Sequence, residues 1–377
     1  MLIHLDDSLR SHLDTLTGGE WDALNNLALA AREGNHFLLA PRPLTELLAL
    51  RPQLGIRERA LYRTLNARYT TIAGMTSQVQ IWVRVSHNII AEQVMIGQSR
   101  EIRLPLSFFS TTTAVQPAIL LCENLDDCYL IYEMARILAR TLGLGNVRTV
   151  VDRRAGGGAT TADVAEDILV AGDRLLVTIV DSDRETPGGS LGETARTTRR
   201  VFSERSPAVG ELVIIQGREL ENLLPDEFYR SEFGHHVDHG ESVDVITALE
   251  AVGCGVARLH IDVKEGLKLE AILSQESVPD DFVVVWGLVV VAVAERRLPV
   301  NESCVACAAA GQCANPQACT CLLTGANRMN LLALGAEAWR ENGLGLLRTL
   351  PHCLESAFTE VARAAFDWGC AASLQSA

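Results

Sequence analysis

Six acidic residues stand just after three apolar runs of the sequence, at points where each run is predicted to end as a strand. They are Glu123, Asp127, Asp181, Asp183, Glu219 and Glu221. The carboxyl ends of parallel strands share one edge of a sheet and lie about 5 Å apart, so these carboxylates are expected to converge. Converging carboxylates repel one another unless a hard cation lies between them, and oxygen-only ligands suit Mg²⁺ or Mn²⁺. The sequence therefore predicts a divalent-cation site at this edge of the sheet.

The chain has 33 basic residues, and its only two lysines, Lys264 and Lys268, stand four positions apart in "HIDVKEGLKLE". Lysine and arginine differ where a compact point charge must approach a single oxygen, or where a basic pKa must shift. This spacing marks the stretch as a candidate for chemistry. Chance clustering of two residues is the alternative interpretation.

The order of predicted elements indicates an α/β fold. From about residue 116, short apolar strands alternate with helices, which is typical of a parallel sheet with helices on both faces. The predicted strands are "AILLC", "VRTVV", "RLLVTIV" and "ELVIIQG". We expect three regions: a mostly helical N-terminal region (1–115), the α/β domain (116–272) and a helical C-terminal region with a cysteine cluster (273–377).

The α/β segment resembles the TOPRIM domain, the metal-binding module of topoisomerases, primases and several nucleases. The resemblance is carried by "LLCENLDD", "RAGGGAT" and "VTIVDSD", and it covers about residues 116–270. Glu123 and Asp127 keep the Glu-x-x-x-Asp spacing, while Asn124 replaces the glycine that often follows the glutamate. With "GRELENLLP" and "DVKEGLK", the pattern is similar to nucleases of the overcoming-lysogenisation-defect (OLD) type, in which acids bind two divalent metals and a downstream lysine assists cleavage.

The resemblance implies a role for each candidate residue in a two-metal mechanism. Glu123 and Asp127 are expected to hold one metal, with Asp126 an uncertain neighbour, and Asp181 and Asp183 the shared or second position. An ordinary helix N-cap is the alternative interpretation of Asp126 or Asp127. Glu219 and Glu221 would complete the shell or orient water. Lys264 is expected to place charge on a non-bridging oxygen or the leaving group in the transition state. Lys268 is expected to contact the flanking backbone phosphate.

The function implied is metal-dependent hydrolysis of DNA or RNA, commonly in anti-phage defence. The chain has no GxxxxGK[ST] motif, and related nucleases often act with an ATPase, so a separate ATPase subunit is an expected partner. A homo-oligomer is also compatible with the sequence. Two alternatives stay open: a TOPRIM primase or topoisomerase-related enzyme, and a non-catalytic subunit that binds nucleic acid or a partner protein.

Three further stretches carry candidate binding residues. The segment after the DSD motif, with Arg196, Arg199, Arg200 and Arg205, is predicted to be either a flexible arm that carries positive charge to nucleic acid or a solvated loop. Gly156–Gly158 are predicted to be either a flexible turn or a place where a phosphate can approach the backbone. His235, His236, Asp238 and His239 form either a metal site or, by the simpler interpretation, a polar surface loop.

Five cysteines fall in one short window, "CVACAAAGQCANPQACTC". They are Cys304, Cys307, Cys313, Cys319 and Cys321. Four thiolates suit a tetrahedral structural Zn²⁺, and the window has little apolar bulk of its own to stabilise it. An iron–sulfur cluster and unliganded or redox-active thiols are the alternatives, and the sequence leaves open whether Cys319 or Cys321 is the fifth, spare thiol.

The composition sets limits on the class of protein. The net charge of −14 works against non-specific nucleic-acid binding, although a site that collects carboxylates for metals contributes to it. The longest apolar run, 282–294, has 13 residues and is too short to span a bilayer, so it is predicted to be a buried strand or core helix. The N-terminus lacks a basic-then-apolar leader, and we expect a cytoplasmic protein with no membrane partner.

Overall fold

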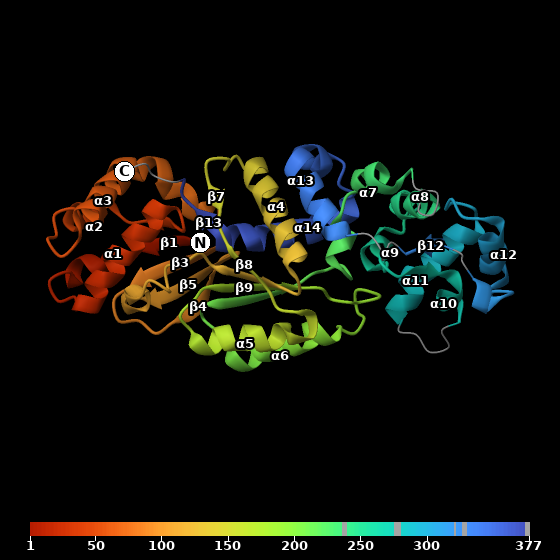
Figure 1. Cartoon of the computed structure of the whole chain (residues 1–377), viewed down its shortest axis with the longest axis horizontal. Helices are drawn as coiled ribbons and strands as arrows, with labels where there is room; N and C mark the ends of the chain where they lie inside the picture. The colour runs from red at the N-terminus through yellow and green to blue at the C-terminus, as the bar shows by residue number, and fades with distance from the viewer. Residues whose placement is uncertain (236–239, 275–279, 320–321, 326–329, 374–377) are drawn as a thin grey trace. The chain divides into compact units, whose positions relative to one another are not determined.

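The computed structural model describes residues 1–235, 240–274, 280–319, 322–325 and 330–373. The chain forms two compact units. The first comprises Met1–Ile179, Thr197–Val213 and Ala362–Ala377, and the second comprises Val180–Arg196 and Ile214–Val361. Strands and helices alternate along much of the chain (Figure 1), which confirms the predicted mixed α/β class with a parallel sheet flanked by helices.

The N-terminal part of the first unit contains a five-stranded sheet in the order β2-β1-β3-β5-β4. Its strands are β1 (Leu2–Leu5), β2 (Phe37–Leu39), β3 (Ile81–Ser86), β4 (Glu92–Ile96) and β5 (Ser99–Pro105). The sheet is parallel except for β4, which pairs antiparallel with β5 at the edge. The expectation of a mostly helical region is therefore incomplete. The strands β1 and β2 have only 4 and 3 residues, too few to show a clear alternation in the sequence.

Three helices accompany this sheet: α1 (Gly18–Glu33), α2 (Arg42–Leu48) and α3 (Ile56–Ile72). Helix α1 begins with a capping box, in which the Thr17 side chain accepts from the Glu20 N–H and the Glu20 carboxylate accepts from the Thr17 N–H. It ends at Gly34, whose left-handed φ of 73° favours glycine.

The second sheet has four strands in the order β10-β9-β6-β8. They are β6 (Ile119–Cys122), β8 (Asp152–Ala155), β9 (Leu176–Val180) and β10 (Gly210–Ile214). Strand β6 pairs in parallel with both β8 and β9. The chain moves from β6 to one side for β8 and then crosses to the other side for β9, so the strand order reverses between β6 and β9. In open α/β sheets, ligands bind beyond the carboxyl ends of the strands at this switch point.

The predicted second strand, 147–151, is wrong in position. Its residues form β7 (Arg148–Thr149), which pairs antiparallel with β13 (Cys370–Ala371) in a separate two-stranded sheet. The strand beside β6 is β8, whose sequence "DRRA" is polar because it lies at the sheet edge with exposed side chains. An edge strand of this kind gives no apolar run for the sequence to reveal.

Helices cover both faces of the four-stranded sheet, with α4 (Leu125–Thr141) on one face and α5 (Thr161–Ala171) and α6 (Glu193–Arg205) on the other (Figure 1). Under α5, Ile119, Leu121 and Leu176 of the strands pack with Ala165 in a buried core, and Ile168 lies against it. Burial on both faces explains why β6 and β9 are continuous apolar runs.

The second unit is largely helical and contains a short antiparallel strand pair, β11 (Gly266–Lys268) with β12 (Leu322–Thr324). Its described helices are η5 (Leu220–Leu223), α7 (Asp226–Phe233), α8 (Gly240–Ala248), α9 (Gly255–His260), α10 (Leu269–Leu273), α11 (Asp280–Ala294), α12 (Glu302–Ala310), η6 (Pro316–Ala318) and α13 (Leu331–Arg348). Helix α14 (His352–Gly369) begins in this unit and ends in the first.

The long apolar run 282–294 forms helix α11, the helical one of the two predicted alternatives. Phe282, Trp286 and Val289 are buried at helical spacing, while Val284 on another face is 64% exposed. A search of the described residues found no helix with the length and apolar character needed to cross a membrane.

Candidate active site

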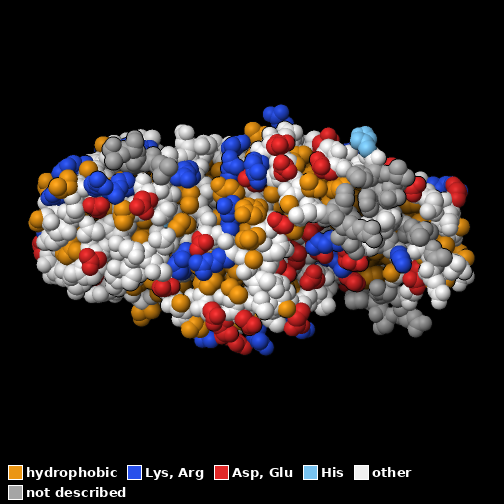
Figure 2. Space-filling view, in the orientation of Figure 1, with side chains coloured by type: hydrophobic (Ala, Val, Ile, Leu, Met, Phe, Trp, Pro, Cys, Tyr) orange, Lys and Arg blue, Asp and Glu red, His pale blue; other side chains and the backbone are white. Residues whose placement is uncertain are grey.

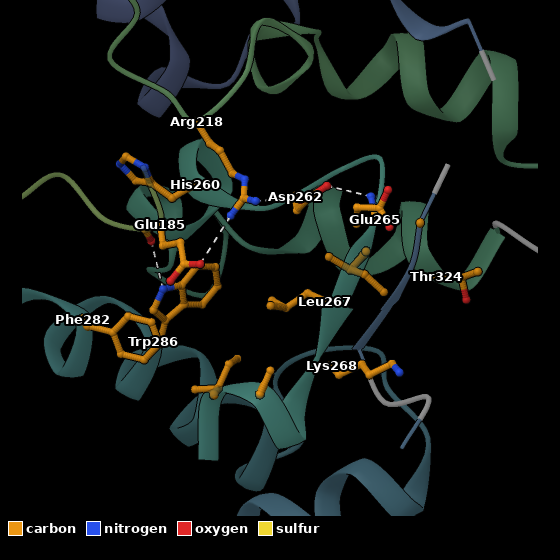
Figure 3. Close-up of a pocket in the computed structure, with 15 residues that line it drawn as sticks. Glu185, Arg218, His260, Asp262, Glu265, Leu267, Lys268, Phe282, Trp286 and Thr324 are labelled. Atoms are coloured by element: carbon orange, nitrogen blue, oxygen red, sulfur yellow. Dashed lines mark hydrogen bonds and ion pairs between the residues drawn. The ribbon is translucent and has the colours of Figure 1, made fainter. Parts of the chain in front are cut away.

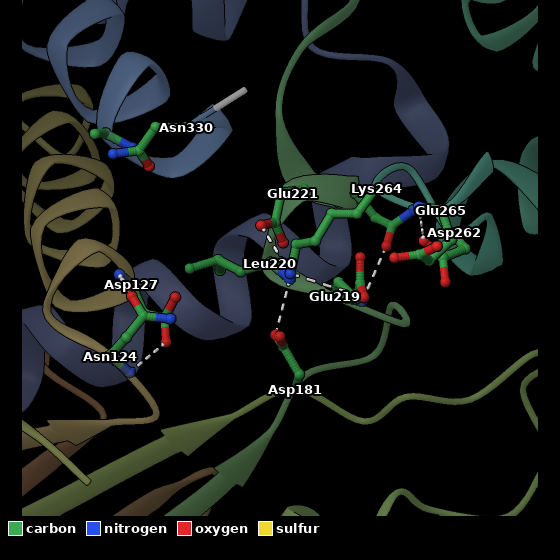
Figure 4. A network of polar contacts seen from close by, with 12 residues as sticks. Asn124, Asp127, Asp181, Glu219, Leu220, Glu221, Asp262, Lys264, Glu265 and Asn330 are labelled. Atoms are coloured by element: carbon green, nitrogen blue, oxygen red, sulfur yellow. Dashed lines mark hydrogen bonds and ion pairs between the residues drawn. The ribbon is translucent and has the colours of Figure 1, made fainter. Parts of the chain in front are cut away.

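Lys264 and two glutamates form the centre of a polar cluster in the second unit (Figure 4). The Lys264 Nζ lies 3.0 Å from Oε1 of Glu221 and 3.8 Å from Oε1 of Glu219. The Glu221 and Glu219 side chains are 2% and 11% exposed, whereas the Lys264 side chain is 39% exposed. We call Asp181, Glu219, Glu221 and Lys264 the carboxylate–lysine cluster.

Asp181 belongs to the cluster through the backbone of η5. Its Oδ1 accepts a hydrogen bond of 2.8 Å from the Leu220 N–H, between the two glutamates in sequence. Asp181 directly follows the last residue of β9, and Glu219 lies five residues beyond the end of β10. The segments that follow these two strands therefore bring three carboxylates of the predicted site together.

Asn222 fixes the turn that carries Glu219 and Glu221 through hydrogen bonds of its side chain. Its Oδ1 accepts from the Glu219 N–H at 2.9 Å, and its side-chain amide donates to the backbone carbonyls of Ile261 at 2.8 Å and Arg258 at 3.2 Å. The Asn222 side chain is fully buried. A buried amide with these partners fixes the turn against the segment that leads to Lys264.

The loop after β9 is tied to the same turn by its backbone. The N–H groups of Ser182 and Asp183 donate to the Arg218 carbonyl at 3.1 and 2.9 Å, and the Ser182 hydroxyl donates to the Gly217 carbonyl at 2.6 Å. The Arg218 side chain makes an ion pair of 2.7 Å with Asp262. These contacts hold the segments of Asp181, Glu219 and Lys264 in one arrangement.

The electrostatics of the cluster follow from burial and close charges. Burial raises the pKa of Glu219 to about 7, an effect that the Lys264 ammonium opposes and the Glu221 and Asp262 carboxylates reinforce. Burial also disfavours the Lys264 ammonium, but Glu221 and Glu219 beside it outweigh that effect and raise the pKa of Lys264. Lys264 is therefore charged near neutral pH, and Glu219 titrates there.

The donor chemistry of the cluster fits a hard divalent cation. Oε2 of Glu219 and Oε2 of Glu221 are buried and have no hydrogen-bond partner in the described chain. Carboxylate oxygens of this kind are the ligands that Mg²⁺ and Mn²⁺ prefer. A geometric search of the described ranges finds no group of three or more His, Cys, Asp or Glu side chains arranged to hold a metal. The Lys264 ammonium is the cation that faces both glutamates in this arrangement.

Asp183 is placed apart from these contacts. Its side chain is exposed and lies against Gly192, where an added Cβ would collide with the carboxylate. Within the described residues, no hydrogen bond or ion pair links Asp183 to Glu219, Glu221 or Lys264. Its φ of 54° turns the chain sharply after Asp181.

Glu123 and Asp127 lie in the first unit, at the end of β6 and the start of α4. Asn124 and Asp127 form a capping box, because the Asp127 carboxylate accepts from the Asn124 N–H at 2.9 Å and Asn124 Oδ1 accepts from the Asp127 N–H at 3.1 Å (Figure 4). Asn124 is thus the N-cap of α4. Asp127 has at least this structural role, and Asp126 lies beside it on the first turn.

The glycine turn is hydrogen-bonded to the end of β6. The N–H groups of Gly157 and Gly158 donate to the backbone carbonyl of Glu123 at 2.8 and 3.2 Å, and that of Gly156 donates to the Cys122 carbonyl at 2.7 Å. The turn therefore fixes the backbone of Glu123, and the approach of a phosphate to these glycines stays a prediction.

The arginine segment is helical over Glu193–Arg205, so the expectation of a flexible arm or loop is wrong there. Arg196 pairs with Glu193 and Arg205 with Glu166 of α5, while Arg199 and Arg200 are exposed. Figure 2 shows acidic and basic side chains intermixed over α5 and α6. Nucleic-acid binding by these arginines stays a prediction.

Three cysteines of the window approach one another. Cys313 Sγ lies 3.6 Å from Cys319 Sγ, and burial together with the neighbouring Cys319 and Cys307 thiols raises the pKa of Cys313 to about 12. Cys304 is buried on α12, and Cys321 lies outside the described residues. Of the histidine stretch, His235 is exposed, and His236, Asp238 and His239 also lie outside the described residues.

Sequence reasoning missed three residues that build the cluster: Arg218, Asn222 and Asp262. Arg218 and Asn222 flank the two glutamates in "GRELEN", and Asp262 precedes Lys264 by two positions, so proximity to the candidate acids was the available signal. Comparison with protein-family models, with curated proteins and with solved structures gives no match to this chain.

Proposed function

We propose that this protein is a divalent-metal-dependent nuclease of the TOPRIM/OLD type. The observation that carries the proposal is the carboxylate–lysine cluster. Two buried glutamates of one turn face the Lys264 ammonium, and Asp181 accepts a hydrogen bond from the backbone of the same turn. The four-stranded sheet supports it, because β6 and β9 flank the switch point and are followed directly by Glu123 and Asp181.

The acids divide into ligands and supporting residues. Glu123 and Asp181 are the proposed principal metal ligands, and Glu219 and Glu221 complete the shell or orient water. Asp127 supports the Glu123 segment as a helix cap, in addition to its proposed role as a ligand. Asp183 would have to turn away from Gly192 to join them, so we give it a peripheral role.

Two Mg²⁺ or Mn²⁺ ions, when bound, would supply a hydroxide nucleophile and stabilise the leaving oxygen. The chain's own groups position and neutralise the substrate. Lys264 places a point charge at the mouth of the cluster, where it can move from Glu221 to a phosphate oxygen. Glu219, with a pKa of about 7, can hold or release a proton during the reaction.

The cysteine window is proposed to bind one structural Zn²⁺. Two thiolates of a tetrahedral zinc site lie about 3.8 Å apart, given a Zn–S distance of about 2.3 Å. The 3.6 Å between Cys313 and Cys319 is close to that value, and Cys307 neighbours the same thiol. Cys304 is the further ligand we propose among the described cysteines.

The proposed partners are a nucleic acid substrate and a separate ATPase subunit, in an anti-phage system located in the cytoplasm. A non-catalytic subunit is the second candidate, favoured by one observation. Lys264 already neutralises the two glutamates, so the cluster could be a stable ion-pair network that needs no metal.

A cleavage assay separates the two. Plasmid DNA, single-stranded DNA and tRNA are incubated with the protein in Mg²⁺, Mn²⁺ or EDTA, with and without candidate ATPase partners. We expect cleavage only with metal, and a loss of at least 100-fold in Glu123→Ala and Asp181→Ala. Asp167→Asn, an exposed acid on α5, is the matched control and should cleave like wild type. Cleavage that persists equally in both alanine variants would refute the assignment.

A further inference from the structure

A cavity of about 580 Å³ opens beside the carboxylate–lysine cluster in the second unit (Figure 3). It shares Arg218, Asp262 and Glu265 with the surroundings of the cluster, and it extends along β11 to Lys268. The volume lies within the range of small-molecule sites, about 300–1,000 Å³. The predicted metal site does not use this space.

One part of the wall is apolar and partly aromatic. Phe282 and Trp286 of α11 line it, with ring centroids 6.2 Å apart, and both side chains are buried in the protein on their other sides. Leu267 and Ile272 face the same space. The Trp286 Nε1–H donates to the Glu185 carbonyl at 3.0 Å, which fixes the indole in place. A flat apolar ligand group fits such a wall.

The polar part of the wall combines three acidic residues with one guanidinium. Glu185, Asp262 and Glu265 line it together with Arg218, which lies 2.7 Å from Asp262 and 3.9 Å from Glu185. His260 Nδ1 lies 3.0 Å from the Arg184 carbonyl, so Nδ1 carries the proton and Nε2 is the acceptor. Burial lowers the pKa of His260, which keeps the ring neutral. These groups recognise a ligand that donates, such as an exocyclic amino group.

Lys268 supplies a cation at the rim of the cavity. Its side chain is exposed and extends from β11 to the side opposite Leu267 (Figure 3), and within the described chain it makes no ion pair. Lys268 follows Lys264 by four residues, and the residues between them belong to the cavity wall or its edge. An anionic group can therefore bind Lys268 while an attached apolar ring enters the cavity.

We propose that this cavity binds one nucleotide unit, with an amino-bearing base (adenine, cytosine or guanine) inside and its phosphate on Lys268. The inference rests on the proposed nuclease function, in which the bound nucleotide is the unpaired nucleotide next to the scissile phosphate. The same chemistry is offered by a free nucleoside monophosphate, and the test separates the two sources.

The test measures binding without catalysis. AMP, CMP, GMP, UMP, adenosine, inorganic phosphate and a five-nucleotide single strand are titrated into the full chain in EDTA, by calorimetry and by tryptophan fluorescence. We expect saturable binding of AMP, CMP and GMP, at least 5-fold weaker binding of UMP, and quenching that disappears in Trp286→Phe.

Two variants locate the site. Ala271→Phe, which fills the cavity from α10, should abolish binding. Lys268→Gln should weaken AMP at least 5-fold and leave adenosine unchanged, and Arg348→Gln, an exposed arginine of α13, is the control. If only the oligonucleotide binds, and Ala271→Phe abolishes this binding, the cavity is assigned to the substrate strand. If the oligonucleotide and the nucleoside monophosphates both bind, the cavity is assigned to free nucleotide as well.

Absence of saturable binding, or binding insensitive to Ala271→Phe and Lys268→Gln, overturns the inference. Failure of the proposed function looks different, because the nucleotide would then bind in EDTA while no metal supports cleavage. A protein that cleaves with Mg²⁺ but binds no nucleotide in this assay retains its nuclease function and loses the nucleotide site.

Discussion

The Lys264 ammonium lies 3.0 Å from a carboxylate oxygen of Glu221, a side chain that is only 2% exposed. This pair explains why lysine stands here in a chain that otherwise uses arginine. A compact ammonium can sit between Glu221 and Glu219, whereas a planar guanidinium needs more room and prefers two parallel hydrogen bonds to one carboxylate. Lys264 therefore compensates the charge of the glutamates and is also the proposed catalytic lysine.

Lys264→Arg should keep the fold and reduce metal-dependent cleavage at least 10-fold, because the larger guanidinium cannot take the same position between the glutamates. Circular dichroism and the cleavage assay check both parts. Cleavage by Lys264→Arg at the wild-type rate would show that this lysine has no special role.

Lys264→Met should lower the free energy of unfolding by about 1–3 kcal/mol, because it leaves two buried carboxylates without a cation; the value is kept small since Lys264 is 39% exposed. The same variant should bind Mn²⁺ more tightly than wild type, since the metal no longer competes with the ammonium. Urea unfolding and Mn²⁺ titration measure the two effects. Unchanged stability would mean that the ion pairs contribute nothing.

Glu219 should contribute a fall in stability as pH rises from about 4.5 to 7. Its folded-state pKa, about 7, exceeds its ordinary value of 4.5, so between these values the folded protein holds a proton that the unfolded chain has lost, and this advantage is gone once pH passes 7. Glu219→Gln should flatten the curve by about 1–3 kcal/mol between pH 5 and 8. Urea unfolding at several pH values measures it.

Asp367 of the first unit, whose pKa burial also raises to about 7, contributes a second part of the same slope. Asp367→Asn is therefore the companion variant, and the double variant should lose both contributions to the slope. The Met1 amino group and His4, His36 and His260 act in the opposite direction, because burial lowers their pKa values. Variant curves that run parallel to the wild-type curve between pH 5 and 8 would contradict both assignments.

Asp127 allows its structural and chemical roles to be separated. Asp127→Ala removes the half of the α4 capping box in which the carboxylate accepts from the Asn124 N–H, and it should cost about 1 kcal/mol of stability. Asp127→Asn keeps an oxygen that accepts from the Asn124 N–H, so it should retain most of that stability and still lose metal-dependent cleavage at least 10-fold. If Asp127→Asn cleaves normally, the residue is a helix cap and no metal ligand.

Zinc in the cysteine window should be stoichiometric, with one ion per chain in protein purified without chelator. Cys313→Ser, which removes the thiol next to Cys319 and Cys307, should lose the zinc and lower the melting temperature. Cys353→Ser, outside the window, is the control. Elemental analysis measures the metal, and a zinc-free wild-type protein would leave unliganded thiols as the better description.

The elements that position the site were predictable where their burial gives a clear pattern of apolar residues in the sequence. Strands β6 and β9 are apolar on both faces, and α4 has a clear amphipathic period between Asn124 and its C-terminus. Strand β8 was misplaced by a few residues because its edge position leaves it polar. The pattern of apolar residues along the sequence reports which side chains are buried, and an exposed edge strand has few buried side chains to report.

The contacts inside the cluster were less predictable than its members. That Lys264 faces Glu221 and Glu219 depends on how Asn222 ties η5 to the Ile261 carbonyl, a contact between residues 39 apart in sequence. The use of Gly157 and Gly158 to hold the Glu123 backbone was missed for a similar reason. Tertiary hydrogen bonds of this kind leave no periodic signature in the sequence.

The most direct test is a double-mutant cycle on Mn²⁺ binding, followed by electron paramagnetic resonance for wild type, Glu123→Gln, Asp181→Asn and the double variant. If both acids hold the same ions, wild type binds two Mn²⁺ per chain, each single variant loses at least 10-fold in affinity, and the double variant loses little more than either single one. Wild-type protein that binds no Mn²⁺, or losses that simply add, would contradict a shared two-metal site.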